Sequence, residues 1–185
     1  MIYLASKSPR RQQLLSQVHI DFELLDGEVD ESVYPGESGE DYCLRVAIAK
    51  AEAGWANKLR LKDVPVLAAD TTVIYNEQIF AKPLDEADAF AMLTILAGQK
   101  HKVLTAVAIK DQYRCLSVLC TTLVTMAPMS VTEIDTYIQS GESLGSAGAY
   151  SIQGCMAKYI EYIEGSYSNV VGLPLYETQQ LLNQF

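Results

Sequence analysis

Three cations lie close together near the amino end of the chain, in the segment LASKSPRRQQLL at residues 4–15. Lys7, Arg10 and Arg11 flank the pair Ser8-Pro9, and a serine followed by a proline is typical of the first turn of a helix. The amino end of a helix carries partial positive charge, so cations there are unfavourable unless an anion lies between them. The pattern predicts an anion-binding site, and the alternative for Arg10 and Arg11 is a solvent-facing helix edge with salt bridges to nearby acids.

A carboxylate interrupts an apolar run further along the chain. Asp70 stands between VLAA and TTVIY, and an unpaired carboxylate buried in a strand would cost several kcal/mol. We therefore expect Asp70 either to have a partner or to end its strand in solvent. Lys82, in the motif FAKP, is a candidate partner, and the alternative is an ordinary surface lysine.

The loop at residues 27–40 is acidic. Its Asp30 and Glu31 are either a solvated surface or, together with Asp70, ligands of Mg²⁺. This ion takes a few carboxylates and completes its shell with phosphate oxygens and water.

Two segments rich in Gly and Ser, at residues 141–155 and 164–175, offer backbone N–H groups that suit anion binding. With the cations and carboxylates above, they suit a triphosphate. Basic groups and N–H donors hold its charge, a metal neutralises more of it, and a carboxylate activates water. The P-loop motif G-x-x-x-x-G-K-[ST] is absent, so this is not a P-loop enzyme.

Other chemistries find little support in the sequence. His19 and His101, the two histidines, are too isolated for a catalytic triad or a zinc site. We interpret His19 as a turn residue and His101 as a strand-edge side chain. The four cysteines form no C-x-x-C pair, and we interpret them as core residues.

Length and charge narrow the class of protein. A chain of 185 residues predicts a single domain over residues 1–185. Its formal net charge of -9 disfavours binding to nucleic acid or to an anionic membrane surface. No apolar run has the length of a membrane span and no signal-type core is visible, so we expect a cytoplasmic protein.

The elements that must position these residues alternate between strands and helices, which predicts an α/β fold with a mixed sheet. A capping box at Ser130 and Glu133 marks one helix start, and Asp85 is the expected N-cap of another. We expect strands at 1–6, 21–26 and 157–163, hairpins at 63–83 and 101–126, and helices at 9–18, 40–59, 84–98, 131–140 and from Pro174 onward.

Seven ordered motifs make the chain recognisable: LASKSPRRQQLL, EVDES, AADTTVI, FAKP, AGQKHKVLTAV, AGAYSIQG and GSYSNVVGLPL. Along nearly its whole length the chain resembles the Maf family of nucleotide pyrophosphatases. The resemblance implies a mixed β-sheet with flanking helices and two lobes around a central cleft, similar to inosine triphosphate pyrophosphatases. It also implies metal-dependent hydrolysis of a nucleoside triphosphate to the monophosphate and pyrophosphate, and favours a homodimer.

The same resemblance implies roles for particular residues. Asp70 would be the general base, with Lys82 as a further catalytic residue near the phosphates. The other implied roles are phosphate binding by Ser6, Arg11 and Lys50, and binding of a divalent metal, Mg²⁺ or Mn²⁺, by Glu31 and Asp70.

Within the family, Arg10, Thr71 and Gln153 resemble the branch that acts on dTTP and UTP. The branch that acts on 7-methyl-GTP has a tryptophan after SP and a glutamate where Gln153 stands. A glutamine amide both donates and accepts, which suits O4 and N3–H of a pyrimidine. The alternative is that Gln153 is a loop amide that satisfies backbone groups.

Two positions depart from the family pattern. Ser146 and Ser151 stand where the family usually has a lysine before AGAY and a glycine after it. Loss of that lysine leaves open a nucleotide-binding regulator, for example in cell division, that turns over little substrate.

Overall fold

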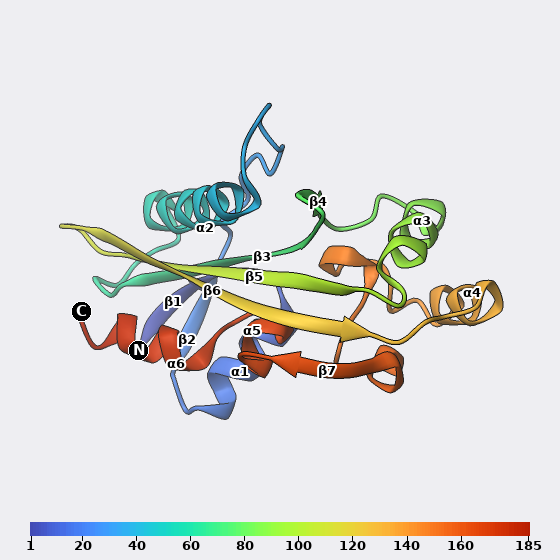
Figure 1. Ribbon diagram of the computed structural model, residues 1–185. Coiled ribbons are helices and arrows are strands. Elements are labelled where there is room, and N and C mark those ends of the chain that lie inside the picture. The colour runs from blue at the N-terminus through green and yellow to red at the C-terminus, as the bar shows by residue number, and fades with distance from the viewer. The chain divides into compact units, whose positions relative to one another are not determined.

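A computed structural model describes residues 1–185, with the elements labelled in Figure 1. The strands are β1 (Ile2–Ala5), β2 (Phe22–Leu25), β3 (Val66–Tyr75), β4 (Gln78–Phe80), β5 (Lys100–Lys110), β6 (Cys115–Met126) and β7 (Ile160–Glu164). The helices are α1 (Pro9–Gln17), α2 (Gly39–Ala56), α3 (Glu86–Leu96), α4 (Val131–Gln139), α5 (Tyr167–Val171) and α6 (Leu175–Leu182), with short 3-10 helices η1 (Ala147–Ala149) and η2 (Cys155–Tyr159).

The strands pair in the order β2-β1-β3-β5-β6-β7, and β4 pairs with β3. Strand β1 runs parallel to both β2 and β3, whereas β4 is antiparallel to β3 and β7 is antiparallel to β6. The turn between β3 and β4 has positive φ at Asn76 (47°) and Glu77 (62°), as a type I′ hairpin turn requires. The predicted mixed α/β fold is confirmed.

The chain divides into two compact units, and the division falls within β3, β5 and β6. Unit 1 comprises Met1–Thr71, Thr105–Cys120 and Gly172–Phe185, and unit 2 comprises Thr72–Leu104 and Thr121–Val171. The implied central cleft stays a prediction.

In unit 1, helix α2 packs against β1 through small residues. Ala47 and Ala51 are fully buried. A Cβ at Gly54 would lie 2.7 Å from the Cβ of Ala5 and 2.9 Å from Cγ1 of Val66. Only glycine allows this approach, which brings the helix close to the strand.

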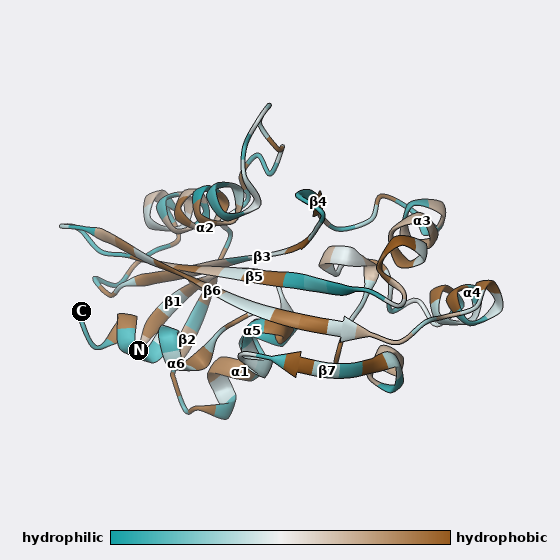
Figure 2. Cartoon of the chain, in the orientation of Figure 1, coloured by the Kyte–Doolittle hydropathy of each residue, from teal (hydrophilic) through white to brown (hydrophobic).

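Unit 2 has an apolar core between its strands and α3 and α4, which lie next to each other (Figure 1). Both predicted helix starts are confirmed. Asp85 accepts from the N–H of Asp88, and Ser130 and Glu133 form a reciprocal capping box. Figure 2 shows that β5 is hydrophilic at its first residues and hydrophobic beyond them.

The carboxyl-terminal third of the chain corrects the sequence interpretation. The predicted strand at 157–163 begins with the 3-10 helix η2, and the strand itself is Ile160–Glu164. The segment expected to be a loop contains α5, which carries the buried Asn169. Its amide donates to Val103 O (3.0 Å) and to Thr122 Oγ1 (2.9 Å). These long-range bonds stabilise a short helix that the local sequence does not predict.

Two further interpretations were wrong. Cys155 is exposed rather than a core residue, unlike the buried Cys43 and Cys120. His101 is buried, and its strand β5 lies between β3 and β6 rather than at an edge of the sheet. His19 does lie in a turn and is exposed, with φ 56°. No helix combines the length and the hydropathy that a bilayer crossing requires.

Candidate active site

Asp70 lies near the end of the unit 1 part of β3 and is only 6% exposed. Nζ of Lys50 donates to its Oδ1 at 2.8 Å. The buried alternative therefore holds, and the carboxylate has the cationic partner that burial demands. Lys50 comes from α2, where it shares the buried helix face with Val46 and Ala47.

A second carboxylate meets the same ammonium group. Oε1 of Glu31 lies 2.7 Å from Nζ of Lys50, so Lys50 bridges Glu31 and Asp70. Its side chain and that of Asp70 are 10% and 8% exposed, and that of Glu31 is 40% exposed. Asp30 makes a local contact instead: its Oδ1 accepts from the N–H and the Oγ of Ser32, and both bonds are exposed.

The two carboxylates near Lys50 are donors of the kind that a divalent metal prefers. No group of three or more His, Cys, Asp or Glu side chains forms a metal site in the chain. Glu31 and Asp70 supply carboxylate oxygens that converge on one cationic position, and Mg²⁺ readily takes its remaining ligands from phosphate and water. The chemistry of these two carboxylates therefore fits a divalent metal.

Arg11 gathers three parts of unit 1. Its Nε donates to Gly172 O (2.9 Å), Nη1 donates to Ser6 Oγ (3.2 Å) and Nη2 donates to Thr71 Oγ1 (3.1 Å). Burial lowers the pKa of Arg11, and the charge of Asp70 opposes that effect. Since an arginine remains protonated in proteins, a fixed positive charge lies between Ser6 and Thr71.

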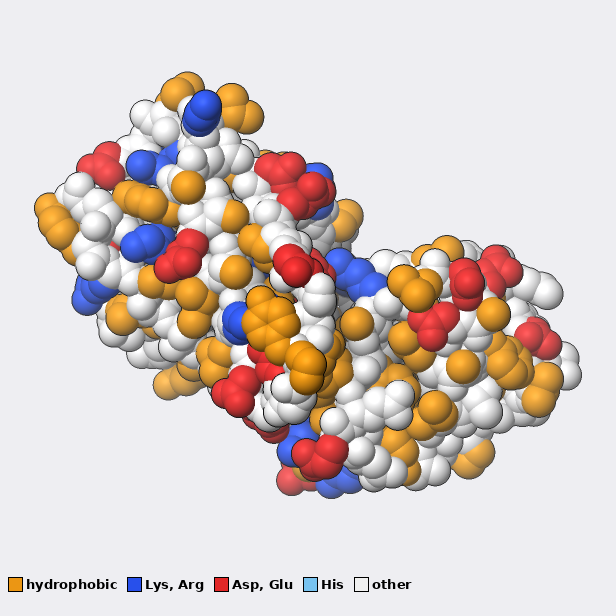
Figure 3. Space-filling view, turned by 90° about the horizontal axis from the view of Figure 1, so that it is seen from above, with side chains coloured by type: hydrophobic (Ala, Val, Ile, Leu, Met, Phe, Trp, Pro, Cys, Tyr) orange, Lys and Arg blue, Asp and Glu red, His pale blue; other side chains and the backbone are white.

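The other cations of the amino-terminal segment have different surroundings. Lys7 is exposed and forms salt bridges with Asp26 and Glu28. Arg10 lies half-buried in the first turn of α1. On the face shown in Figure 3, Lys and Arg side chains lie singly or in small groups among acidic ones.

Lys82 and Gln153 are exposed residues of unit 2, and their roles stay predictions. Ser146 is buried, and its Oγ has no hydrogen-bond partner. Ser151 is half-buried, and its N–H donates to the hydroxyl of Tyr137 at 3.1 Å.

Sequence reasoning missed several residues around Glu31 and Asp70. The hydroxyl of Tyr42 donates to Glu31 O (3.0 Å), and Sγ of Cys43 donates to Asp70 O (3.4 Å). A signal for Tyr42 was present, because it precedes Lys50 by eight residues and so lies close to the same helix face.

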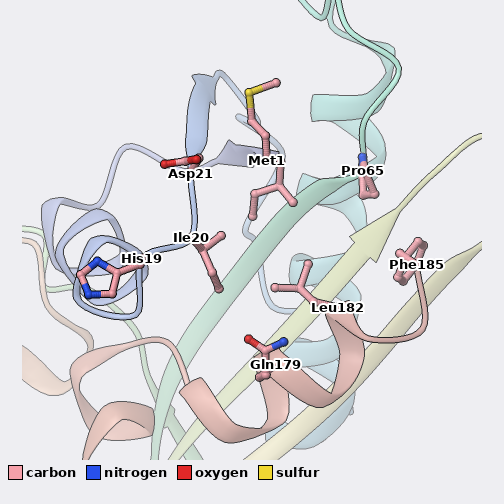
Figure 4. Close-up of a pocket in the computed structure, with 9 residues that line it drawn as sticks. Met1, His19, Ile20, Asp21, Pro65, Gln179, Leu182 and Phe185 are labelled. Carbon is pink, nitrogen blue, oxygen red and sulfur yellow. The ribbon is translucent and has the colours of Figure 1, made fainter.

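A separate pocket of about 410 Å³ lies in unit 1 (Figure 4). Apolar side chains such as Ile20 and Leu182 line it together with the polar His19, Asp21 and Gln179. It contains none of the predicted site residues.

Fold and site together define an α/β protein with a mixed sheet, a basic helix start and a largely buried lysine that bridges two carboxylates. The family model described as "Maf-like protein" matches residues 1–185, and the chain belongs to the Maf family.

Curated relatives cover almost the whole chain. It is 46% identical over 185 residues to a protein of Pseudoalteromonas atlantica, in a match that spans 100% of this chain and 96% of that protein. A protein of Cupriavidus pinatubonensis is 48% identical over 99% of this chain and 96% of its own length. One of Yersinia pestis is 48% identical over 100% and 92%. All three are named dTTP/UTP pyrophosphatase.

Two solved structures resemble the chain more distantly. The Staphylococcus aureus Ham1 protein has a TM-score of 0.45 and 16% identity over 68% of this chain and 71% of that one. Protein VC0702 of Vibrio cholerae has a TM-score of 0.42 and 9% identity over 76% of each chain.

Proposed function

We propose that this protein hydrolyses dTTP, UTP and modified pyrimidine nucleoside triphosphates to the monophosphate and pyrophosphate. The names of relatives 46–48% identical over nearly the full chain support this activity. The structural observation that carries the proposal is the ammonium group of Lys50, which holds the carboxylates of Glu31 and Asp70 together beside Arg11.

In this proposal Asp70 is the general base. Its carboxylate takes a proton from a water molecule, the water oxygen forms a bond to the α-phosphorus, and the bond from that phosphorus to the bridging oxygen breaks to release pyrophosphate. Lys50 turns its ammonium group to the phosphate oxygens when the triphosphate binds, which frees an oxygen of Asp70. When bound, Mg²⁺ or Mn²⁺ would be held by Glu31 and Asp70 and would neutralise charge on the phosphates.

Ser6 and Arg11 bind phosphate in this scheme. Arg11 has five N–H groups, and its three bonds to Gly172, Ser6 and Thr71 leave two of them for an anion. The oxygen of Ser6 accepts from Arg11 and from the N–H of Ser8, so its hydroxyl proton is directed elsewhere. Lys82 adds a further charge at the phosphates, as the family resemblance implies.

Pyrimidine preference is proposed to depend on Arg10, Thr71 and Gln153. Thr71 Oγ1 accepts from Arg11 and also bonds to Thr105 Oγ1 at 3.0 Å, so Thr71 acts by orienting Arg11. Arg10 and Gln153 then carry the choice of base. Competition between dTTP and 7-methyl-GTP in Arg10→Trp and Gln153→Glu tests this, and an unchanged pyrimidine preference in both variants contradicts it.

The decisive experiment measures pyrophosphate release from a panel of canonical and modified triphosphates, with and without Mg²⁺ or Mn²⁺. Asp70→Asn should reduce release by roughly 10²–10⁴-fold, the usual contribution of a general base. The matched control is Asp63→Asn, an exposed aspartate whose side chain is 77% accessible. Robust turnover by Asp70→Asn contradicts the role of the base.

A second candidate function is a nucleotide-binding regulator with little turnover. The observation that favours it is the buried Ser146 hydroxyl, which has no hydrogen-bond partner and stands where the family usually has lysine. Tight binding of a triphosphate without pyrophosphate release, together with activity gained in Ser146→Lys, would support it. A cytoplasmic location and a homodimer complete the proposal.

A further inference from the structure

Two side chains of α2 hold the loop that carries Glu31. The hydroxyl of Tyr42 donates to Glu31 O at 3.0 Å, and Nη2 of Arg45 donates to Ser32 O at 2.8 Å. Two successive carbonyl groups of the loop are thus bound to one helix. Residues 26–34 contain no helix or strand of their own, so these bonds replace the support that regular structure would give.

Arg45 is itself fixed from several directions. Its Nε and Nη2 donate to the two carboxylate oxygens of Glu37 at 2.6 and 2.8 Å, and its guanidinium lies 3.9 Å from the ring centroid of Tyr34. The N–H of Tyr34 donates to the same carboxylate at 3.0 Å. Hydrogen bonds from Arg45 lower the pKa of Glu37 to about 2, so this ion pair persists at physiological pH.

Glu31 is consequently held at both of its ends by the same helix. Tyr42 binds its carbonyl group and Lys50 binds its carboxylate. The two α2 residues are eight positions apart, a little over two helical turns. Movement of the loop backbone would therefore move the Glu31 carboxylate away from Lys50 and Asp70.

We infer that Tyr42 and Arg45 are positioning residues, which fix Glu31 beside Asp70 for the metal-bound triphosphate by binding the backbone at residues 31 and 32. Neither needs to touch the substrate. The catalytic consequence rests on the proposed function, whereas the anchoring of the loop does not.

The test uses Tyr42→Phe, which removes one hydroxyl and keeps the ring, and Arg45→Met, which removes the guanidinium and keeps most of the stem. In pyrophosphate release, the Mn²⁺ concentration for half-maximal activity should rise roughly 2- to 10-fold per lost hydrogen bond, with a smaller change in kcat at saturating Mn²⁺. In hydrogen exchange of the protein without nucleotide, the amides of residues 29–36 should exchange faster and those of residues 46–56 should not.

A double-mutant cycle separates positioning from general stability. Combined with Glu31→Gln, Tyr42→Phe should have no further effect on the Mn²⁺ requirement, because it acts through Glu31.

Matched controls come from two residues that bind loop backbone elsewhere in unit 1. The Tyr3 hydroxyl accepts from the N–H groups of Leu61 and Lys62, and Arg60 donates to Lys62 O at 3.1 Å and stacks on the ring of Trp55 at 3.7 Å. Tyr3→Phe and Arg60→Met should change neither the Mn²⁺ requirement nor exchange at residues 29–36.

Unchanged exchange at residues 29–36 in both Tyr42→Phe and Arg45→Met overturns the inference. So does an effect of Tyr42→Phe on the Mn²⁺ requirement that is equally large with and without the Glu31→Gln substitution. If the unaltered protein releases no pyrophosphate from any triphosphate, the proposed function fails, and the exchange experiment still decides whether Tyr42 and Arg45 anchor the loop.

Discussion

Unit 1 and unit 2 each contain a polar cluster with buried members, and these two clusters differ in charge. In unit 1, Lys50 bridges Glu31 and Asp70, and this cluster has a formal excess of one negative charge. In unit 2, Nε2 of His101 lies 2.8 Å from the hydroxyl of Tyr150, with the rings edge to face. Burial lowers the pKa of His101 to about 4 and raises that of Tyr150, so both are neutral at pH 7.

This difference in charge indicates that the two clusters have different roles. In the neutral pair, Nε2 of His101 and the hydroxyl of Tyr150 bond to each other, and neither side chain carries a net charge that would attract an ionic ligand. The charged cluster carries a desolvation penalty and a formal excess of one negative charge, which attracts a further cation. We therefore propose binding for the charged cluster and structural support for the neutral pair.

The largest expected effect comes from breaking the charged cluster with Lys50→Met. Two carboxylates would lose the ammonium group between them, which should lower the free energy of unfolding by about 3 kcal/mol, the low end for a broken buried pair because Glu31 is partly exposed. Pyrophosphate release should fall by roughly 10²–10³-fold. Urea unfolding and pyrophosphate assays measure the two effects, and unchanged stability would show that Lys50 is not needed to hold the carboxylates.

An intermediate effect is expected from the neutral pair, as a dependence of stability on pH. The unfolded chain protonates His101 near pH 6.5 and the folded chain only near pH 4. The unfolded state therefore binds more protons between these values, and the free energy of unfolding should fall by about 2–3 kcal/mol as the pH falls through this window.

His101→Gln should remove this fall of the free energy of unfolding with pH, measured by urea unfolding at pH 7, 5.5 and 4. His19→Asn, at the exposed histidine, should retain it. If the free energy of unfolding falls equally with pH in both variants, the assignment to His101 is contradicted.

The smallest effect is expected from Ser130, a helix cap that lies outside both clusters. Ser130→Ala removes the capping box of α4 in unit 2 and should lower the free energy of unfolding by about 1 kcal/mol. Because α4 carries no proposed site residue, KM and kcat for pyrophosphate release should stay unchanged. A shift in KM would mean that the stability of α4 affects substrate binding.

The local sequence pattern was sufficient to predict most elements. Neighbouring residues predict the caps at Asp85 and Ser130, the turn at Asn76 and Glu77, and the buried face of α2. The local pattern also singled out Asp70, since a carboxylate inside an apolar strand needs a partner or solvent.

The pairing of charges could not be obtained in the same way. Lys50, Glu31 and Asp70 come from a helix, a loop and a strand, and only tertiary packing brings them together. His101 gave no signal of burial because its partner Tyr150 lies 49 residues away in the chain. For α5, the stabilising bonds of Asn169 reach residues on β5 and β6, so the segment resembles a loop when read alone.

The contact between Ala5 and Gly54 has a consequence for protein engineering. Ala5 directly precedes Ser6, and Gly54 follows Lys50 by one helical turn, so this contact between two small residues helps to set the spacing between two residues of the proposed site. A Cβ at position 54 would lie 2.7 Å from that of Ala5 and would force the helix outward. A single added methyl group would then change the distance between Ser6 and Lys50, although the methyl group itself lies outside the proposed site.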